Sequence, residues 1–435
     1  MSQTVLHNFP STSRLWREVL RQWIVKNLAP FVFLSAFFLT VVIGNFLFTT
    51  DYGRRRLMEV PRYAVIYDFP TIFTPLYWLL LFLPFLLVPP IVVLVRRMLG
   101  SSIYRWCSKI PEIRILDYVV ITCLALGFVG YSLWQAQAFA LYGAGSDAVS
   151  SVEIRFQILA GLSFWAMAVL MSILPYLAVY ALIRCFRRSG LFWIVAAAVV
   201  IIIESIYMIL LNMKWPFLLF EATLVLTIFS HSKTYPYVKT SIGAVALFAA
   251  YLIISVHVFR LDQPVRDQPV SVAKTAWQRA PEMVFAGLTR MATLYPFYYQ
   301  IFTEEGSVCG GIREQARVGP SCRPSTYVYT RIFGHDGFEG RGTAPAAVHI
   351  SGYALGGWPI AIFALVCASI ILGLLACLPQ GASALIGAFG IMGAVAGYHF
   401  SQLPGEGPLF YDHGLVWTLI PMIIYVAWRK FFTPS

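Results

Sequence analysis

The chain has 435 residues, of which 59% are hydrophobic and 12% are charged, and its formal net charge is +12. Soluble domains are about 45–50% apolar and about 25% charged, so this composition excludes a soluble globular protein. Apolar runs of about 20 residues recur along the sequence and are typical of membrane-spanning helices. The short alternating segments of a transmembrane β-barrel are absent from the sequence. We therefore expect an all-α polytopic membrane protein.

Ten apolar segments are expected to cross the membrane, and more crossings are expected if loop segments re-enter it. The first run is too long for the core of a cleavable signal peptide and has no small-residue cleavage site after it, so we expect it to remain as an anchor. The fifth and sixth segments are separated only by "NMK", which predicts a tight helical hairpin. In chain order the segments cover residues 28–49, 74–95, 117–140, 157–183, 191–211, 215–230, 241–259, 357–378, 383–399 and 414–428.

Lys and Arg gather beside alternate ends of these segments, a pattern that orients membrane proteins. It places residues 1–27 and 429–435 in the cytoplasm and explains most of the positive charge without a nucleic-acid partner. Transmembrane helices 1–7 then lie within residues 28–259, and helices 8–10 lie within 357–428. Residues 260–356 are expected to form one long loop with short helices on the outer side of the membrane.

Several cations lie near the outer ends of the predicted helices. Lys214 occupies the "NMKWP" turn, Arg290 precedes "MATLYP", and Arg155 opens the fourth segment. Such a side chain can simply extend to lipid phosphates. Together with Arg331 and Arg341, these cations can instead line one cavity, which would suit a lipid-linked phosphate or pyrophosphate because guanidinium and ammonium groups bind phosphate oxygens.

The stretch from residue 329 to 365 begins as a Gly-rich polar loop and ends as an apolar helix. His335, Glu339 and His349 in this stretch are candidate proton carriers, because imidazole and carboxyl groups serve as general bases near neutral pH. Each histidine is alternatively a hydrogen-bonding loop residue. The loop also contains Cys309 and Cys322, and a disulfide between them is plausible if the loop lies outside the cytoplasm.

An aromatic run, "YPFYY", contributes Tyr295, Tyr298 and Tyr299 to the same loop. These rings can stack on sugar rings or anchor the loop in the membrane interface. Motifs for nucleotide hydrolysis, zinc proteolysis and serine hydrolysis are absent from the sequence. No metal and no cofactor is inferred, because the sequence shows no repeated acidic pair and no Cys/His spacing typical of a metal site.

Four segments resemble the O-antigen or oligosaccharide repeat-unit polymerases, the Wzy-like family of integral membrane glycosyltransferases. They are the hairpin "ILLNMKWPFLLF", the loop piece "TRMATLYP", the spacing from Arg331 to Gly342, and "GTAPAAVHISGYALGGWPIAI". The region of the fourth predicted membrane segment, "EIRFQILAGLSFWAMAVLMSILPYL", is also similar to the family. The resemblance covers roughly residues 140–380. The hairpin departs from the family pattern, because Asn-Met-Lys-Trp stands where the family has a Gly-Ser-Arg-Gly type of turn.

The resemblance implies a GT-C-like, metal-independent glycosyltransferase of the bacterial inner membrane, with its active face in the periplasm. It would polymerise polyprenyl-pyrophosphate-linked repeat units, which serve as donor and acceptor, and release polyprenyl pyrophosphate during surface polysaccharide or lipopolysaccharide synthesis. Membrane lipid and a chain-length regulator are the further partners that the resemblance implies.

The resemblance also assigns roles to residues. Lys214, Arg290 and Arg331 would bind the pyrophosphate, with Arg155 and Arg341 beside them. His349 would be the base that activates the acceptor hydroxyl, with Glu339 and His335 as alternatives. The sugar-binding side chains would be Tyr295, Tyr298, Tyr299 and Tyr353.

Other functions stay open. An O-antigen ligase, which transfers glycan to lipid A-core, shares this architecture and donor. A transporter of intact lipid-linked glycan would use Glu204 and Glu221, because a carboxyl inside a membrane segment is a functional candidate by default. Against a transporter, the ionisable residues gather on one face and the sequence shows no internal repeat. A structural scaffold would tolerate the loss of every cation named above.

Overall fold

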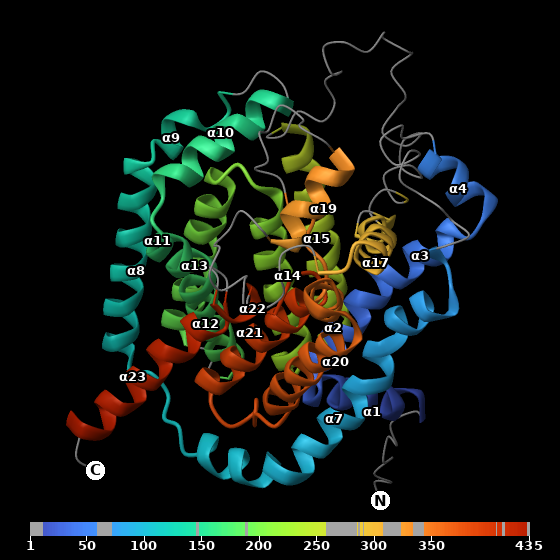
Figure 1. Ribbon diagram of the computed structural model, residues 1–435. Coiled ribbons are helices and arrows are strands. Elements are labelled where there is room, and N and C mark those ends of the chain that lie inside the picture. The colour runs from blue at the N-terminus through green and yellow to red at the C-terminus, as the bar shows by residue number, and fades with distance from the viewer. Residues whose placement is uncertain are drawn as a thin grey trace, which may run out of the picture.

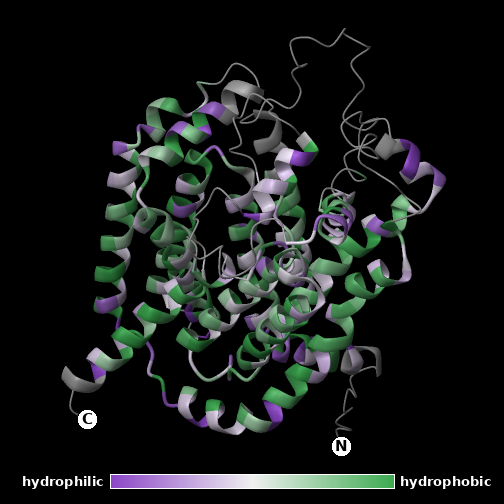
Figure 2. Ribbon diagram, viewed as in Figure 1, coloured by the Kyte–Doolittle hydropathy of each residue, from purple (hydrophilic) through white to green (hydrophobic). Residues whose placement is uncertain are grey.

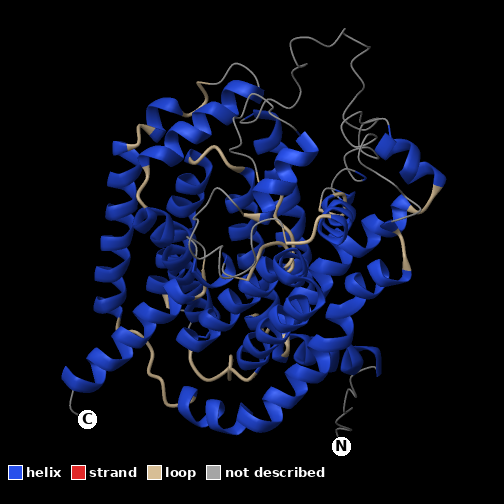
Figure 3. Cartoon of the chain, in the orientation of Figure 1, coloured by secondary structure: helices blue, strands red, loops and turns tan. Residues whose placement is uncertain are grey.

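The computed structural model describes residues 12–58, 72–144, 148–187, 190–257, 285, 288–289, 291–307, 323–333, 343–405, 407–410 and 414–432. Every regular element in these ranges is a helix (Figure 3). The expected all-α architecture is therefore confirmed for the described part of the chain.

Six continuous helical segments are long and apolar enough to cross a membrane: α2–η1–α3 (Leu28–Phe48), α7 (Pro75–Cys107), α8 (Ile115–Gln135), α11–η2–α12 (Phe164–Arg187), α13 (Leu191–Leu210) and α20 (Val348–Ala376). The protein is thus a multi-pass membrane protein by the length and composition of its helices. Four further apolar helices are α14 (Lys214–His231), α15 (Pro236–His257), α21 (Ala384–Phe400) and α23 (Val416–Phe432). Each of the ten predicted segments overlaps one of these helices, and the crossing of the membrane by the last four stays a prediction.

The bundle has two chemically different ends. The first helix, α1 (Thr12–Lys26), and the last turns of α23 lie at one end, together with the turns at residues 108–114, 232–235 and 377–383, and we call it the basic end (Figure 1). The opposite end, which we call the loop end, carries the short helices α4 (Asp51–Met58), α9 (Ala138–Leu141), α10 (Ala148–Gly161), α17 (Leu294–Glu304) and α19 (Pro324–Phe333). Figure 2 shows hydrophobic residues along the helices and hydrophilic residues gathered at both ends.

The predicted boundaries differ most from the structure in three segments. The second segment runs on to Cys107 rather than ending at 95, and Figure 1 shows α7, which contains Pro84, Pro89 and Pro90, curving beneath the bundle. Prolines bend a helix because they remove a backbone hydrogen bond and crowd the preceding turn. The fourth segment is two helices, because α10 ends at Gly161 and a new helix begins after Ser163, whose side chain caps it by accepting from the Ala166 amide at 3.2 Å.

The eighth segment also begins earlier than predicted. Its helix starts at Val348 instead of residue 357 and is interrupted at Gly356 and Gly357, where Gly357 has φ of 67°. Such a backbone conformation is open to glycine and strained for residues with a Cβ atom. The first turns of α20 therefore form a separate short helix, joined to the longer part of α20 by a kink at this glycine pair.

Helix α12 lies at the centre of the bundle and α8 at its periphery. The apolar window of the segment that contains α12 is 83% buried, whereas that of α8 is 22% buried. Helix α2 packs so closely on α21 that a Cβ atom at Gly397 would lie 2.4 Å from the Ala29 carbonyl oxygen. The exposed apolar residues of α8, such as Leu116 and Leu124, are those expected to face lipid.

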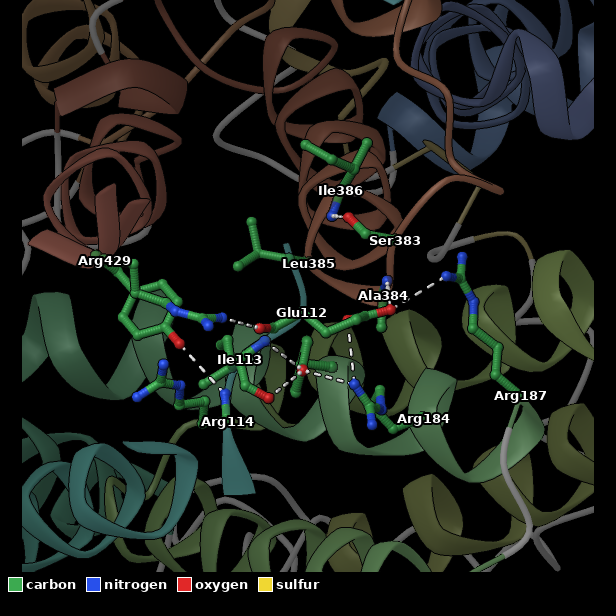
Figure 4. Close-up of polar contacts among 12 residues, drawn as sticks. Glu112, Ile113, Arg114, Arg184, Arg187, Ser383, Ala384, Leu385, Ile386 and Arg429 are labelled. Atoms are coloured by element: carbon green, nitrogen blue, oxygen red, sulfur yellow. Dashed lines mark hydrogen bonds and ion pairs between the residues drawn. The ribbon is translucent and has the colours of Figure 1, made fainter. Parts of the chain in front are cut away.

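The basic end is cross-linked by Glu112, which lies between α7 and α8 (Figure 4). Its carboxylate accepts from the Ala384 amide at 2.8 Å, at the first residue of α21, and pairs with Arg184 and Arg187 at 3.4 Å each. Its carbonyl oxygen accepts from Arg429 at 2.9 Å. One loop residue thus joins the ends of α12, α21 and α23, because charge-assisted hydrogen bonds fix their geometry.

Candidate functional site

A cavity of about 220 Å³ lies between α11–η2–α12, α14 and α21, toward the loop end. We call it the loop-end cavity. Its walls are mostly apolar and include five methionines: Met167, Met171, Met208, Met213 and Met392. Methionine side chains are flexible and polarisable, so they adapt to irregular apolar ligands. The walls therefore suit a hydrocarbon chain better than a rigid polar molecule.

Polar groups enter this cavity from the last turns of α21 and the residues after it. His399, which is 3% exposed, lines the cavity together with Tyr398 and Gln402. The Gln402 side-chain amide donates to the Thr40 hydroxyl at 2.8 Å, which fixes its orientation. The Tyr398 ring packs against Trp215, with ring centroids 5.3 Å apart. The polar groups thus lie at one end of an otherwise apolar cavity.

Both π-helices of the described chain meet this site. η2 (Val169–Ile173) contains Met171, which lines the cavity, and η1 (Phe38–Val42) contains Thr40, which holds Gln402. A π-helix widens one turn of a helix at a cost in stability, and such turns occur mostly at functional sites. One such turn in the cavity wall, and a second that holds Gln402, favour a functional site over a simple packing defect.

The predicted hairpin is confirmed as α13 and α14, joined at Leu211–Met213. Asn212 closes the turn with φ of 53°, in the left-handed region that Asn tolerates. Met213 and Trp215 both line the cavity, so the backbone of Lys214 between them runs along its wall. The side chain of Lys214 lies outside the described part of the structure.

Four other predicted site residues lie outside the described residues: Arg290, His335, Glu339 and Arg341. The same holds for Cys309 and Cys322. The predictions made for these six residues stay predictions.

Arg331 lies on α19 and forms an ion pair with Glu305, just after α17. The Tyr327 hydroxyl donates to the same carboxylate. This hydrogen bond, followed by Arg331, lowers the pKa of Glu305, and it raises the pKa of Tyr327. The Arg331 side chain is 56% exposed and already neutralised, so phosphate binding would require it to leave or share Glu305.

Arg155 lies on α10, with its guanidinium carbon 5.0 Å from the centre of the Phe156 ring. The prediction that it opens the fourth membrane segment is wrong, since that segment begins after Ser163. Leu159 on the same helix lines the loop-end cavity. Residues four apart share one face of a helix, so the structure places Arg155 one turn from the cavity.

His349 is 0% exposed in the first turn of α20, with its ring 5.2 Å from that of Phe37. It does not line the loop-end cavity. The structure gives its ring nitrogens no side-chain hydrogen-bond partner within the described ranges. In this conformation the ring is packed among apolar side chains and is closed to an acceptor sugar.

The four predicted sugar-binding tyrosines are also enclosed. Tyr298 donates to the Ala344 carbonyl at 2.6 Å, and Tyr295 accepts from the Ala347 amide at 2.9 Å, so both hold the segment that leads into α20. Tyr299 and Tyr353 stack with ring centroids 5.8 Å apart. Their exposed fractions are 0%, 1%, 6% and 7% for Tyr295, Tyr298, Tyr299 and Tyr353. The structure thus assigns them packing contacts in place of open stacking surfaces.

Glu204 and Glu221 face the interior of the α13–α14 hairpin. Glu204 is 0% exposed, and neither of its carboxyl oxygens has a hydrogen-bond partner among the described residues. Glu221 accepts from the Ser205 hydroxyl at 3.1 Å. An isolated carboxylate in an apolar interior is strongly disfavoured, so the neutral acid is the favoured form of Glu204.

Sequence reasoning missed His399 and Gln402. His399 ends the ninth apolar segment and Gln402 follows it, in "GYHFSQLPG", where polar residues ordinarily mark the end of a membrane helix. Among the described residues, no group of three His, Cys, Asp or Glu side chains could hold a metal ion.

Searches against protein-family models, curated proteins and solved structures find no match to this chain.

Proposed function

We propose that the protein is a membrane glycosyltransferase that polymerises polyprenyl-pyrophosphate-linked oligosaccharide repeat units at the periplasmic face of the bacterial inner membrane. The observation that carries the proposal is the loop-end cavity, whose apolar, methionine-rich wall ends in polar groups from α21 and in the hairpin turn at Lys214. A lipid-linked substrate has the same division, with a hydrocarbon chain joined to a charged head.

The lipid chain would lie along the methionines, and its pyrophosphate would meet Lys214 at the hairpin turn. Arg155, one turn from the cavity on α10, is the next cation that could approach the pyrophosphate. Arg290, Arg331 and Arg341 of the loop would add charge as the leaving group departs. Cations held where negative charge develops supply much of the rate enhancement in such reactions.

The acceptor hydroxyl needs a base, and we assign that role to His399. His399 lines the cavity, whereas His349 is enclosed beside Phe37. As the acceptor oxygen bonds to the anomeric carbon, its proton passes to a ring nitrogen of His399. The bond from that carbon to the pyrophosphate oxygen breaks, and polyprenyl pyrophosphate leaves with the electron pair. The single displacement inverts the anomeric centre.

The test gives purified protein a lipid-pyrophosphate-linked repeat unit and resolves the glycan products on a gel. The wild type should produce a ladder of lengthening chains and release lipid pyrophosphate. Lys214→Ala and His399→Gln should each reduce the rate by about 10²-fold or more. Lys233→Ala, just beyond the other end of α14, is the matched charge control and should retain full activity.

The same assay separates the alternatives. A single transfer seen only with lipid A-core would identify a ligase and reject the polymerase. Unchanged glycan length under both conditions would reject glycosyl transfer altogether.

Proton-coupled transport is a second candidate function, favoured by the enclosed carboxyl of Glu204. In proteoliposomes, a transporter would move intact lipid-linked glycan and acidify the lumen in step. Glu204→Gln would uncouple the two fluxes. If intact glycan crosses the membrane without any movement of protons, this candidate is rejected.

A further inference from the structure

A second cavity, of about 590 Å³, lies at the basic end, opposite the proposed active site. We call it the basic-end cavity. Its walls come from α1 (Thr12–Lys26), the last part of α7, the end of α14 and the turn between α20 and α21. Figure 1 shows α1 and the curved α7 passing beneath the bundle at this end. The volume falls in the range of about 300–1,000 Å³ typical of small-molecule sites.

The walls of this cavity are positively charged. Arg21, Lys26 and Arg96 line it, and none of its described lining residues is acidic. Arg21 is occupied by Glu18 and by the carbonyls of Phe229 and Ser232. These contacts fix α1 against the end of α14, so Arg21 positions the wall.

Arg96 makes fewer hydrogen bonds than Arg21. Its Nη1 donates to the Asn27 side-chain oxygen at 3.2 Å, and the structure gives its other N–H groups no partner among the described residues. Arg97, the next residue of α7, is exposed and does not line the cavity. Arg96 therefore presents an available guanidinium to the cavity, and guanidinium groups bind phosphate through paired hydrogen bonds.

Gln380 and Ser230 also line the cavity. The side-chain oxygen of Gln380, a residue that is 8% exposed, and the hydroxyl oxygen of Ser230 are buried and have no hydrogen-bond partner in the described structure. The Gln380 side chain packs closely on Gly390, where a Cβ atom would lie 2.9 Å from its amide carbon. A buried amide oxygen without a donor costs free energy, and a ligand hydroxyl would satisfy it.

We propose that the basic-end cavity binds an anionic phosphoglycerol group, with its phosphate on Arg96 and Lys26 and its glycerol hydroxyls on Gln380 and Ser230. This inference is independent of the proposed enzymatic function. The group can come from a phosphatidylglycerol headgroup or from a soluble glycerol phosphate. The exposed Trp16 and Trp23 of α1 favour the lipid, because such a helix lies at a membrane surface.

Native mass spectrometry of the full-length, delipidated protein in detergent tests the site. Phosphatidylglycerol should bind the wild type and Arg97→Gln equally, and should bind Arg96→Gln about tenfold more weakly. Both variants lose one charge on neighbouring residues, so a general loss of electrostatic attraction would affect them alike. Gln380→Leu should abolish the preference for phosphatidylglycerol over phosphatidic acid, which lacks the glycerol hydroxyls.

Soluble glycerol 3-phosphate distinguishes the two sources. If it competes only at concentrations far above those of phosphatidylglycerol, the lipid is the ligand. If it binds the wild type as tightly as the lipid does, the site belongs to a soluble phosphate. Equal binding of phosphatidylglycerol and phosphatidylcholine, with no effect of Arg96→Gln, would overturn the proposal. Lys26→Gln replaces Arg96→Gln if the latter does not elute as folded protein.

Discussion

Glu112 and Glu204 are carboxyl groups with opposite surroundings in the same bundle. Glu112, at the basic end, meets Arg184, Arg187 and the first amide of α21. Glu204, inside the α13–α14 hairpin, is fully enclosed, and neither carboxyl oxygen has a hydrogen-bond partner among the described residues. The first is surrounded by two guanidinium groups and a backbone donor, whereas the second lies in an apolar interior where a charge is strongly disfavoured. In so apolar a chain, a carboxyl group with several partners has a structural role, whereas an enclosed one without partners in the described structure is a candidate functional group.

The largest expected effect comes from removing the ion. Glu112→Ala leaves Arg184 and Arg187 without their counter-charge and the start of α21 without its acceptor. We expect a loss of about 3 kcal/mol in unfolding free energy, measured by thermal unfolding in detergent. Glu18→Ala is the control, because Arg21 keeps its two carbonyl partners there. Equal losses in the two variants would contradict the role given to Glu112.

Breaking a neutral buried hydrogen bond at the loop end should have an intermediate effect on stability. The Tyr77 hydroxyl donates to Asn45, which is 0% exposed and also donates to the Val41 carbonyl in η1 at 2.9 Å. Tyr77→Phe leaves the Asn45 oxygen buried without that donor, at a cost of about 1–2 kcal/mol. The unfolding midpoint of Tyr77→Phe should therefore fall between those of wild type and Glu112→Ala. An unchanged midpoint would show that the pair is not formed.

Replacing each glutamate by glutamine sharpens the comparison between Glu204 and Glu112. Glutamine resembles a protonated glutamic acid, so Glu204→Gln should change the unfolding free energy by less than about 0.5 kcal/mol. Glu112→Gln, which removes an ion from two arginines, should cost several times more. Infrared spectroscopy of the wild type at neutral pH should show a protonated carboxyl band that Glu204→Gln removes. A band that is unchanged in the variant would contradict the neutral state.

Another small effect concerns Glu305, at the exposed contact of α17 with α19. Tyr327 and Arg331 lower the pKa of its carboxyl below the ordinary 4.5. Because the folded pKa is lowered, the contribution is present above pH 4.5 and is lost as the pH falls through the folded pKa. The pair is largely exposed, so the effect is about 0.5 kcal/mol. Hydrogen exchange in α19, corrected for intrinsic rates, should accelerate on acidification, and Glu305→Gln should remove that acceleration.

The sequence predicted the helices better than their ends. Hydropathy located all ten apolar helices, and the three-residue spacer "NMK" predicted the hairpin, because a tight turn needs few residues. The predicted helix boundaries were wrong where local chemistry overrides hydropathy. The prolines of α7 are accommodated within one long helix, and the Gly356–Gly357 pair lets a helix continue past a break.

The candidate site was harder to predict. His349 and His399 both adjoin apolar segments, and nothing in their local sequence shows which ring lines a cavity. That difference arises from contacts between distant parts of the chain, such as Phe37 against His349 and Thr40 against Gln402. The tyrosines of "YPFYY" were predicted either to stack on sugar rings or to anchor the loop. In the structure the hydroxyls of Tyr295 and Tyr298 instead contact backbone groups at Ala347 and Ala344, partners that no local pattern reveals.

The hairpin has a consequence for how the chain is made. Helices α13 and α14 are joined by three residues, so neither can enter the bilayer far ahead of the other during synthesis. Each carries one carboxyl, Glu204 and Glu221, and an isolated helix with a charged residue at its centre inserts poorly. Entering as a pair, the helices would shield these two groups from hydrocarbon before the later segments leave the ribosome. We therefore expect the insertion of the sixth predicted segment to depend on that of the fifth.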